Sequence, residues 1–236
     1  MNWGDHFDAI YCVNLADNRH RRVLVEGELR RVGILDSGIF RWKTTVRNPL
    51  YRYIWTHPDF NTEAWWLDID GALNCTLAHY EIYLEGIAMD YERVLVIEDD
   101  VRFLKDIDEI TRILEAAPDY DICLFDKYIS SDKRQYINTV RDCKVNTDYF
   151  RYDGIHLLST GCYAVSARAM RTMAKAQEEQ WVPADSVTNK QREDGLIRVA
   201  PVTNLAVQDM RLKPVMNEVD YILYSQIADL NQYNLS

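Results

Sequence analysis

The sequence lacks the features of a membrane or secreted protein. In its 236 residues, no apolar run approaches the roughly 18 residues that a transmembrane helix needs. The first residues, Met1–Asp5, contain neither a basic region nor an apolar run, so no signal peptide is expected. The five cysteines are scattered and odd in number, and they form neither a disulfide framework nor a CxxC pair. We therefore expect buried free thiols in a reducing cytoplasm, with at most peripheral contact with the inner face of the membrane.

Positive charge is also scarce. Lysine and arginine number 27 against 37 acidic residues, which gives a net charge of −10. Nucleic-acid binding needs a basic surface, so we expect no nucleic-acid partner. The dinucleotide-binding pattern GxGxxG is absent as well. We find no internal repeat and no low-complexity linker. The sequence therefore predicts one domain over residues 1–236, with a weakly patterned tail from about residue 214; its oligomeric state is open.

The most informative stretch is Val94–Val101, in which four apolar, strand-favouring residues run into Glu98, Asp99 and Asp100. The apolar run predicts a buried, central and parallel strand. Ligands of open α/β sheets bind at the carboxyl ends of such strands. Three neighbouring carboxylates repel one another unless a cation compensates them, and Mg²⁺ or Mn²⁺ prefers oxygen ligands. The alternative is an acidic turn with solvated carboxylates.

Other segments predict the elements of an α/β fold. Ala9–Leu15 indicates a first strand, and Asp17 or Asn18 begins an arginine-rich helix that ends near Gly33. Residues from about Asp36 to Asp70 have little periodicity and predict an irregular excursion. Further helices are expected over Ala72–Ala88, Asp106–Ala116 and Ala167–Glu178, and strands over Asp121–Phe125, Gly161–Val165 and part of Leu196–Leu205. His79 lies in one of these helices, where a lone histidine is more often a packing or hydrogen-bonding residue than a ligand.

A short motif permits a different function. Asp68 and Asp70 flank one residue in Trp65–Leu73, which resembles the first motif of haloacid-dehalogenase-type phosphatases. On that interpretation Asp68 is the nucleophile and Asp70 the acid/base, with Mg²⁺ near Asp99 and Asp100. The resemblance covers about nine residues.

A second resemblance extends from about residue 8 to 208. Five segments, in order, are similar to motifs of glycosyltransferase family 25, which contains lipopolysaccharide and collagen sugar transferases: Asn14–Arg22, Gly71–His79, Val94–Val101, Thr160–Ser166 followed by Ala169, and Pro183-Ala184-Asp185. Asn74 and Ala78 depart from that pattern, in which glycine and serine are common. The resemblance implies a GT-A-like single α/β domain with a mostly parallel central sheet flanked by helices. It also implies a nucleotide-sugar donor, a divalent metal and inversion at the anomeric carbon.

The family resemblance gives roles to particular residues. Glu98 and Asp100 are expected to hold Mn²⁺ or Mg²⁺ against the donor phosphates, and Asp99 to contact the donor sugar or ribose. Asn14 and Leu15 are expected to seat the nucleotide, with Arg19 or Arg22 near the phosphates. Asp185 is the expected catalytic base, with Asp126, Glu193 and Asp194 as rivals, and Gln208 and His156 are weaker candidates for polar contacts. The expected donor is UDP-galactose or UDP-glucose, and the expected acceptor is a saccharide of lipopolysaccharide or another surface glycan. A catalytically inactive nucleotide-sugar-binding module is the non-enzyme alternative.

Overall fold

The computed structural model describes residues 2–46, 69–129, 138, 140–152, 157–158, 160–179, 184 and 195–209. A short 3₁₀ helix at Trp3–Asp5 precedes the first strand. The α-helices are α1 (Arg19–Arg31), α3 (Ile69–Ala88), α4 (Ile107–Glu115) and α6 (Ala167–Glu179). The strands are β1 (Ala9–Leu15), β2 (Phe40–Thr45), β3 (Arg93–Glu98), β4 (Val101–Phe103), β5 (Ile122–Leu124), β6 (Tyr128–Ile129), β7 (Tyr149–Arg151), β8 (Leu157–Leu158), β9 (Cys162–Ser166), β10 (Arg198–Pro201) and β11 (Ala206–Gln208).

A seven-stranded sheet organises the fold, in the order β2-β1-β3-β9-β5-β10-β7. Strand β1 is parallel to both β2 and β3, and β5 is parallel to β10. Strand β9 lies antiparallel between β3 and β5, and β7 is antiparallel to β10. Most strands therefore run in one direction, which confirms the predicted α/β class and its mostly parallel central sheet. Strand β3 is central, as expected, although only one of its two neighbours is parallel to it.

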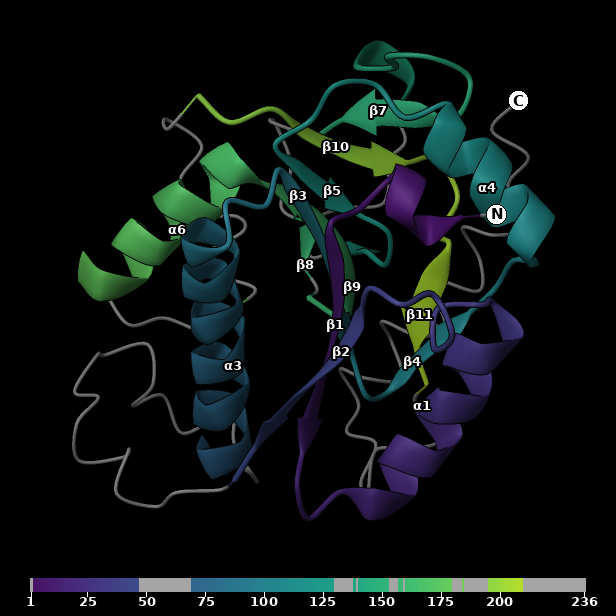
Figure 1. Ribbon diagram of the computed structural model, residues 1–236. Coiled ribbons are helices and arrows are strands. Elements are labelled where there is room, and N and C mark those ends of the chain that lie inside the picture. The colour runs from purple at the N-terminus through teal and green to yellow at the C-terminus, as the bar shows by residue number, and fades with distance from the viewer. Residues whose placement is uncertain are drawn as a thin grey trace.

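Helices cover both faces of the sheet (Figure 1). Helices α3 and α6 pack on one face, and α1 and α4 lie on the other. The alternation along β3 shows how the sequence builds these two layers: Val94 and Val96 belong to the core under α3 and α6, whereas Leu95 and Ile97 belong to the core under α1 and α4. A strand buried on both faces needs a continuous apolar run, which is the pattern seen in the sequence.

Local signals placed several element ends correctly. Asp106 caps α4 by accepting the backbone N–H of Glu109 at 2.9 Å. The Ser166 hydroxyl accepts the N–H of Ala169 at 3.1 Å and so caps α6. Gly33 follows α1 with a φ of 71°, the left-handed conformation in which glycine commonly ends a helix. These boundaries depend on contacts within a few residues, which is why the sequence predicts them.

Two expectations for the region between α1 and β3 need correction. Phe40–Thr45 is not irregular: it forms the edge strand β2, in parallel register with β1. Its alternation of aromatic and basic residues is short, so the sequence alone does not distinguish this strand from a loop. The pairing with β1 defines it as a strand. Helix α3 begins at Ile69, three residues earlier than Ala72. In the described part of the chain, no helix is both long and apolar enough to span a membrane.

Candidate active site

The carboxyl end of β3 brings Asp99 and Asp100 into contact with β1 and α1. The Asn14 amide, near the end of β1, donates a hydrogen bond to Asp99 Oδ2 at 2.6 Å. Arg21, in the first turns of α1, places Nη1 2.9 Å from Asp99 Oδ1 and donates from Nη2 to Asp100 Oδ2. Both aspartates are buried, at 5% and 6% exposure. A single guanidinium thus pairs with two adjacent buried carboxylates, and its one positive charge offsets only one of their two negative charges.

The electrostatics of this pair show how strongly it depends on a cation. Burial raises the pKa of Asp99 to about 6; the charge of Arg21 opposes that rise, and the charge of Asp100 adds to it. Burial alone lowers the pKa of Arg21, but the attraction of Asp100 and Asp99 outweighs burial and raises it. The acids are therefore neither solvated nor an exposed turn, which removes the alternative of a solvated acidic turn at Asp99 and Asp100.

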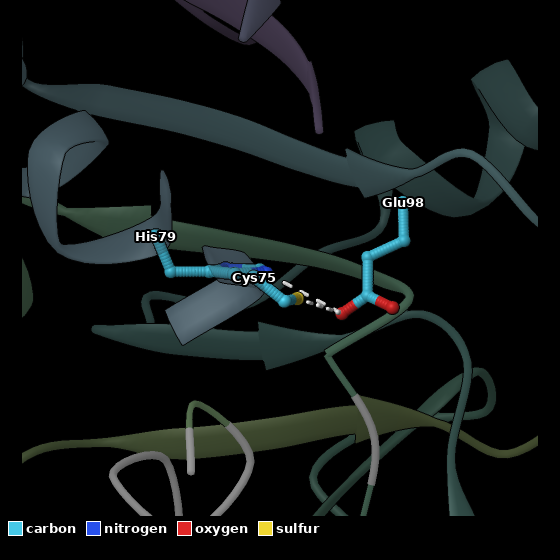
Figure 2. Close-up of side chains that lie close together, drawn as sticks. All are labelled: Cys75, His79 and Glu98. Atoms are coloured by element: carbon cyan, nitrogen blue, oxygen red, sulfur yellow. Dashed lines mark hydrogen bonds and ion pairs between the residues drawn. The ribbon is translucent and has the colours of Figure 1, made fainter. Parts of the chain in front are cut away.

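Glu98 faces the opposite side of the sheet. Its Oε1 accepts a hydrogen bond from the Thr160 hydroxyl at 2.7 Å and lies 3.3 Å from Nε2 of His79. Cys75 Sγ lies 3.8 Å from the same oxygen. Figure 2 shows Cys75 and His79 converging on this carboxylate. Burial raises the pKa of Glu98, but hydrogen bonds and charge from His79, with the Thr160 hydroxyl, outweigh burial, so its pKa lies below the usual value.

The residues predicted to contact the nucleotide lie in different environments in the structure. Asn14 and Asp99 are in contact, as described above, and Leu15 lies half-buried beside Asn14 at the end of β1. Arg19 is exposed. Arg22 packs its guanidinium 4.1 Å from the centroid of the Trp42 ring and pairs with Glu26 at 3.3 Å.

Arg21, which contacts both aspartates, is the residue that the sequence interpretation missed. Val25 and Leu29 are buried on the sheet-facing side of α1, and they lie four and eight residues after Arg21. Residues four apart share one face of a helix. The apolar periodicity of α1 therefore places both Arg21 and Arg22 near the sheet-facing side and Arg19 away from it. The contacts with Asp99 and Asp100 are what distinguish Arg21 from Arg22.

The remaining candidates are distributed around β9 and β11. Asp126 is fully buried at the end of β5 and accepts the backbone N–H of Cys162 at 2.9 Å. Gln208 pairs in register with Val101, next to Asp100. Other candidates lie outside the described residues: Asp185, Glu193, Asp194 and His156.

The phosphatase motif has a different local structure from the one it requires. Asp70 lies in the first turn of α3, so it does not sit in a loop that follows a strand. Asp68 lies outside the described residues. The same helix carries Cys75 and His79, which approach Glu98 from the next turns, and these contacts assign the segment to the helix that packs against β3.

Comparison with known families decides between the interpretations. The model of glycosyltransferase family 25, a family described as LPS biosynthesis proteins, matches residues 69–188, about half of the chain. The chain belongs to glycosyltransferase family 25. The matched range contains α3, β3 with its three acids, β9 and α6, and it begins after Asn14 and the arginines of α1. Membership makes the protein a glycosyltransferase and overturns the phosphatase interpretation.

The solved structures to which this chain is similar have low sequence identity to it. A glycosyltransferase involved in the glycosylation of the major capsid of PBCV-1 is 10% identical, with 94% of this chain and 99% of that chain covered and a TM-score of 0.45. The inositol-1-phosphate CTP transferase from T. maritima is 12% identical, with 95% and 97% covered and a TM-score of 0.43. No curated protein sequence matches the chain significantly. At these scores the structural likenesses carry no functional argument, and the family match alone supports the assignment.

Proposed function

We propose that this glycosyltransferase moves a hexose from a nucleotide-sugar, with UDP-galactose or UDP-glucose as the expected donor, to a saccharide acceptor of lipopolysaccharide or another surface glycan, with inversion and a divalent metal. The observation that carries the proposal is the buried pair Asp99 and Asp100 at the carboxyl end of β3, joined to α1 by Arg21. This is the edge where α/β sheets bind their ligands. The family match includes this strand and its acids.

The residues at this edge fit Mn²⁺ or Mg²⁺. Both ions prefer oxygen ligands and bind through one or two carboxylates together with substrate phosphates. Asp100 keeps the ligand role expected for it. Because the Glu98 carboxylate contacts α3, we assign the second oxygen ligand to Asp99 rather than to Glu98. When bound, the ion supplies positive charge that stabilises the leaving nucleoside diphosphate.

Each side chain near the pair has a role in this proposal. Asn14 holds the Asp99 carboxylate in one orientation through its amide. Arg21 occupies the position from which a guanidinium can pair either with the carboxylates or with an incoming diphosphate, since both offer oxygens to its fork of donors. Removal of the proton from the acceptor hydroxyl needs a carboxylate, and we propose Asp185 for that step. The alternative base Asp126 is occupied by the backbone of β9.

The test is a binding and turnover experiment on the purified protein. UDP, UDP-sugars, GDP and CMP are titrated by calorimetry and thermal shift, with and without Mn²⁺, for the wild type, Asp100→Asn and Asp185→Asn. A ligand that binds the folded state raises its apparent stability. We expect one nucleotide to stabilise the wild type in a metal-dependent way, Asp100→Asn to lose that effect, and Asp185→Asn to bind the donor but lose transfer.

Two results contradict parts of the proposal. Absence of stabilisation by any nucleotide contradicts the nucleotide-sugar donor. Metal-dependent binding with no transfer to any glycan acceptor, and no hydrolysis of the donor, indicates the inactive binding module instead. The anomeric configuration of the product, read by NMR coupling constants, tests inversion.

A further inference from the structure

Cys75, His79 and Glu98 form a second cluster of ligand-type side chains, on the face of β3 opposite Arg21. Cys75 and His79 lie four residues apart on α3, so they project from one face of the helix, one turn apart. Their ligand atoms and a carboxylate oxygen of Glu98 all lie within 4.8 Å of one another. Figure 2 shows both side chains directed at the Glu98 carboxylate.

We infer that this cluster is a zinc site, separate from the Mn²⁺ or Mg²⁺ site proposed for Asp99 and Asp100. Zn²⁺ binds thiolate sulfur at about 2.3 Å and imidazole nitrogen or carboxylate oxygen at about 2.0–2.2 Å, so the edges of its tetrahedron are about 3.3–3.6 Å. The separation of His79 Nε2 from Glu98 Oε1 is 3.3 Å, and that of Cys75 Sγ from the same oxygen is 3.8 Å. A thiol, an imidazole and a carboxylate are a zinc ligand set, whereas Mg²⁺ takes oxygens.

The surrounding side chains supply the outer contacts that zinc ligands need. His79 Nδ1 lies 2.6 Å from the Tyr163 hydroxyl, which lies 2.7 Å from the hydroxyl of Tyr83. A proton on Nδ1, donated to Tyr163, leaves the Nε2 lone pair directed toward Glu98 and ready for a metal ion. Thr160 fixes the Glu98 carboxylate through its hydroxyl. Such outer partners orient the ligands of zinc sites.

A protonated histidine is the competing explanation. A proton on His79 Nε2 also offsets the charge of Glu98 and makes the pair an ordinary buried ion pair. In that explanation the Cys75 thiol keeps its proton and donates a weak hydrogen bond to the same carboxylate oxygen, at 3.8 Å. A zinc ion uses all three side chains: the Cys75 thiol loses its proton on binding, and the three protein ligands leave a fourth position for water or a substrate oxygen.

Metal content and a cobalt spectrum test the inference without reference to activity. The full chain is purified without chelator, and its zinc is measured by mass spectrometry; a chelated sample is then titrated with Zn²⁺ and Co²⁺. We expect one zinc per chain and, with Co²⁺, a thiolate-to-cobalt charge-transfer band. Cys75→Ser should lose that band, and His79→Gln should lose most of the zinc. Tyr163→Phe should keep the site but weaken its affinity by about 10-fold, as loss of an outer contact does.

Matched controls separate this site from other thiols, other histidines and the proposed donor site. Cys143 and His20 are exposed, so Cys143→Ser and His20→Gln should bind zinc as the wild type does. Asp100→Asn should also keep the zinc while losing metal-dependent nucleotide binding, so a failure of the proposed function and a failure of the zinc site are distinguishable. Circular dichroism confirms that each variant is folded. Equal zinc affinity in wild type and Cys75→Ser overturns the inference, as does a folded wild type that takes up no zinc; either result leaves the ion pair as the explanation.

Discussion

Lys127 offers a quantitative test of how this fold treats buried charge. It follows β5, its side chain is only 4% exposed, and its Nζ donates a hydrogen bond to Asn204 Oδ1 at 2.7 Å. Burial lowers the pKa of Lys127 to about 7, while Cys123 and Asp126 oppose that shift. In the unfolded chain a lysine has a pKa of about 10.4. We therefore expect Lys127 to be mostly neutral in the folded protein above neutral pH.

The sign and size of the effect follow from proton binding. Between the two pKa values the unfolded chain holds one proton more than the folded chain, so the free energy of unfolding rises with pH by about 1.4 kcal/mol per unit. The free energy of unfolding therefore falls as the pH falls toward 7. Below that value Lys127 is protonated in both states, and its effect on the free energy of unfolding no longer changes with pH. Integrated from pH 6 to pH 8.5, the rise amounts to about 2 kcal/mol. Lys127→Met keeps the apolar stem and removes the titrating amine.

The assay is urea unfolding of wild type and Lys127→Met, followed by tryptophan fluorescence across this pH range. Comparing the two proteins cancels the titration of the acids, cysteines and tyrosines that both contain. We expect the stability of the variant relative to wild type to fall by about 2 kcal/mol as the pH rises from 6 to 8.5. Loss of the hydrogen bond to Asn204 adds a constant offset. Lys175 has a side chain 76% exposed, so Lys175→Met is the control and should track the wild type. Parallel curves for wild type and Lys127→Met refute the reasoning.

Two further predictions concern the site itself. Arg21→Met leaves Asp99 and Asp100 buried without their cation, so we expect the free energy of unfolding at neutral pH to fall by about 3 kcal/mol and to be partly recovered by Mn²⁺. Arg19→Met changes an arginine at an exposed position and is the control. Equal stability of the two variants contradicts the role of Arg21. Gly161→Ala places a methyl group against Asp126 Oδ2, closer than van der Waals contact allows, and we expect a cost of about 1–3 kcal/mol in urea unfolding. Gly27→Ala, which meets nothing within 4 Å in α1, should instead stabilise by about 0.5–1 kcal/mol; a gain at both positions shows that the packing at Gly161 has been misjudged.

Local patterns made much of the fold predictable. The apolar run Val94–Ile97 indicated a strand covered on both faces, and it lies third in the sheet, with α3 and α6 on one side and α1 and α4 on the other. Capping residues such as Asp106 and Ser166 fixed the starts of helices because their partners lie three residues away. Edge strand β2 escaped prediction, because a short strand with partly exposed side chains is defined mainly by its partner.

The candidate site divides in the same way. The sequence by itself determined that acids gather at the end of a buried strand, because burial of an apolar run and the repulsion of adjacent carboxylates are properties of neighbouring residues. Only the tertiary structure decided which side chains contact those acids. The pleat of β3 and the turn that follows direct Glu98 toward Cys75 and His79, whereas Asp99 and Asp100 meet Arg21 on the other side. These partners come from α3 and α1, far from the acids along the chain, and only the folded sheet brings them within bonding distance.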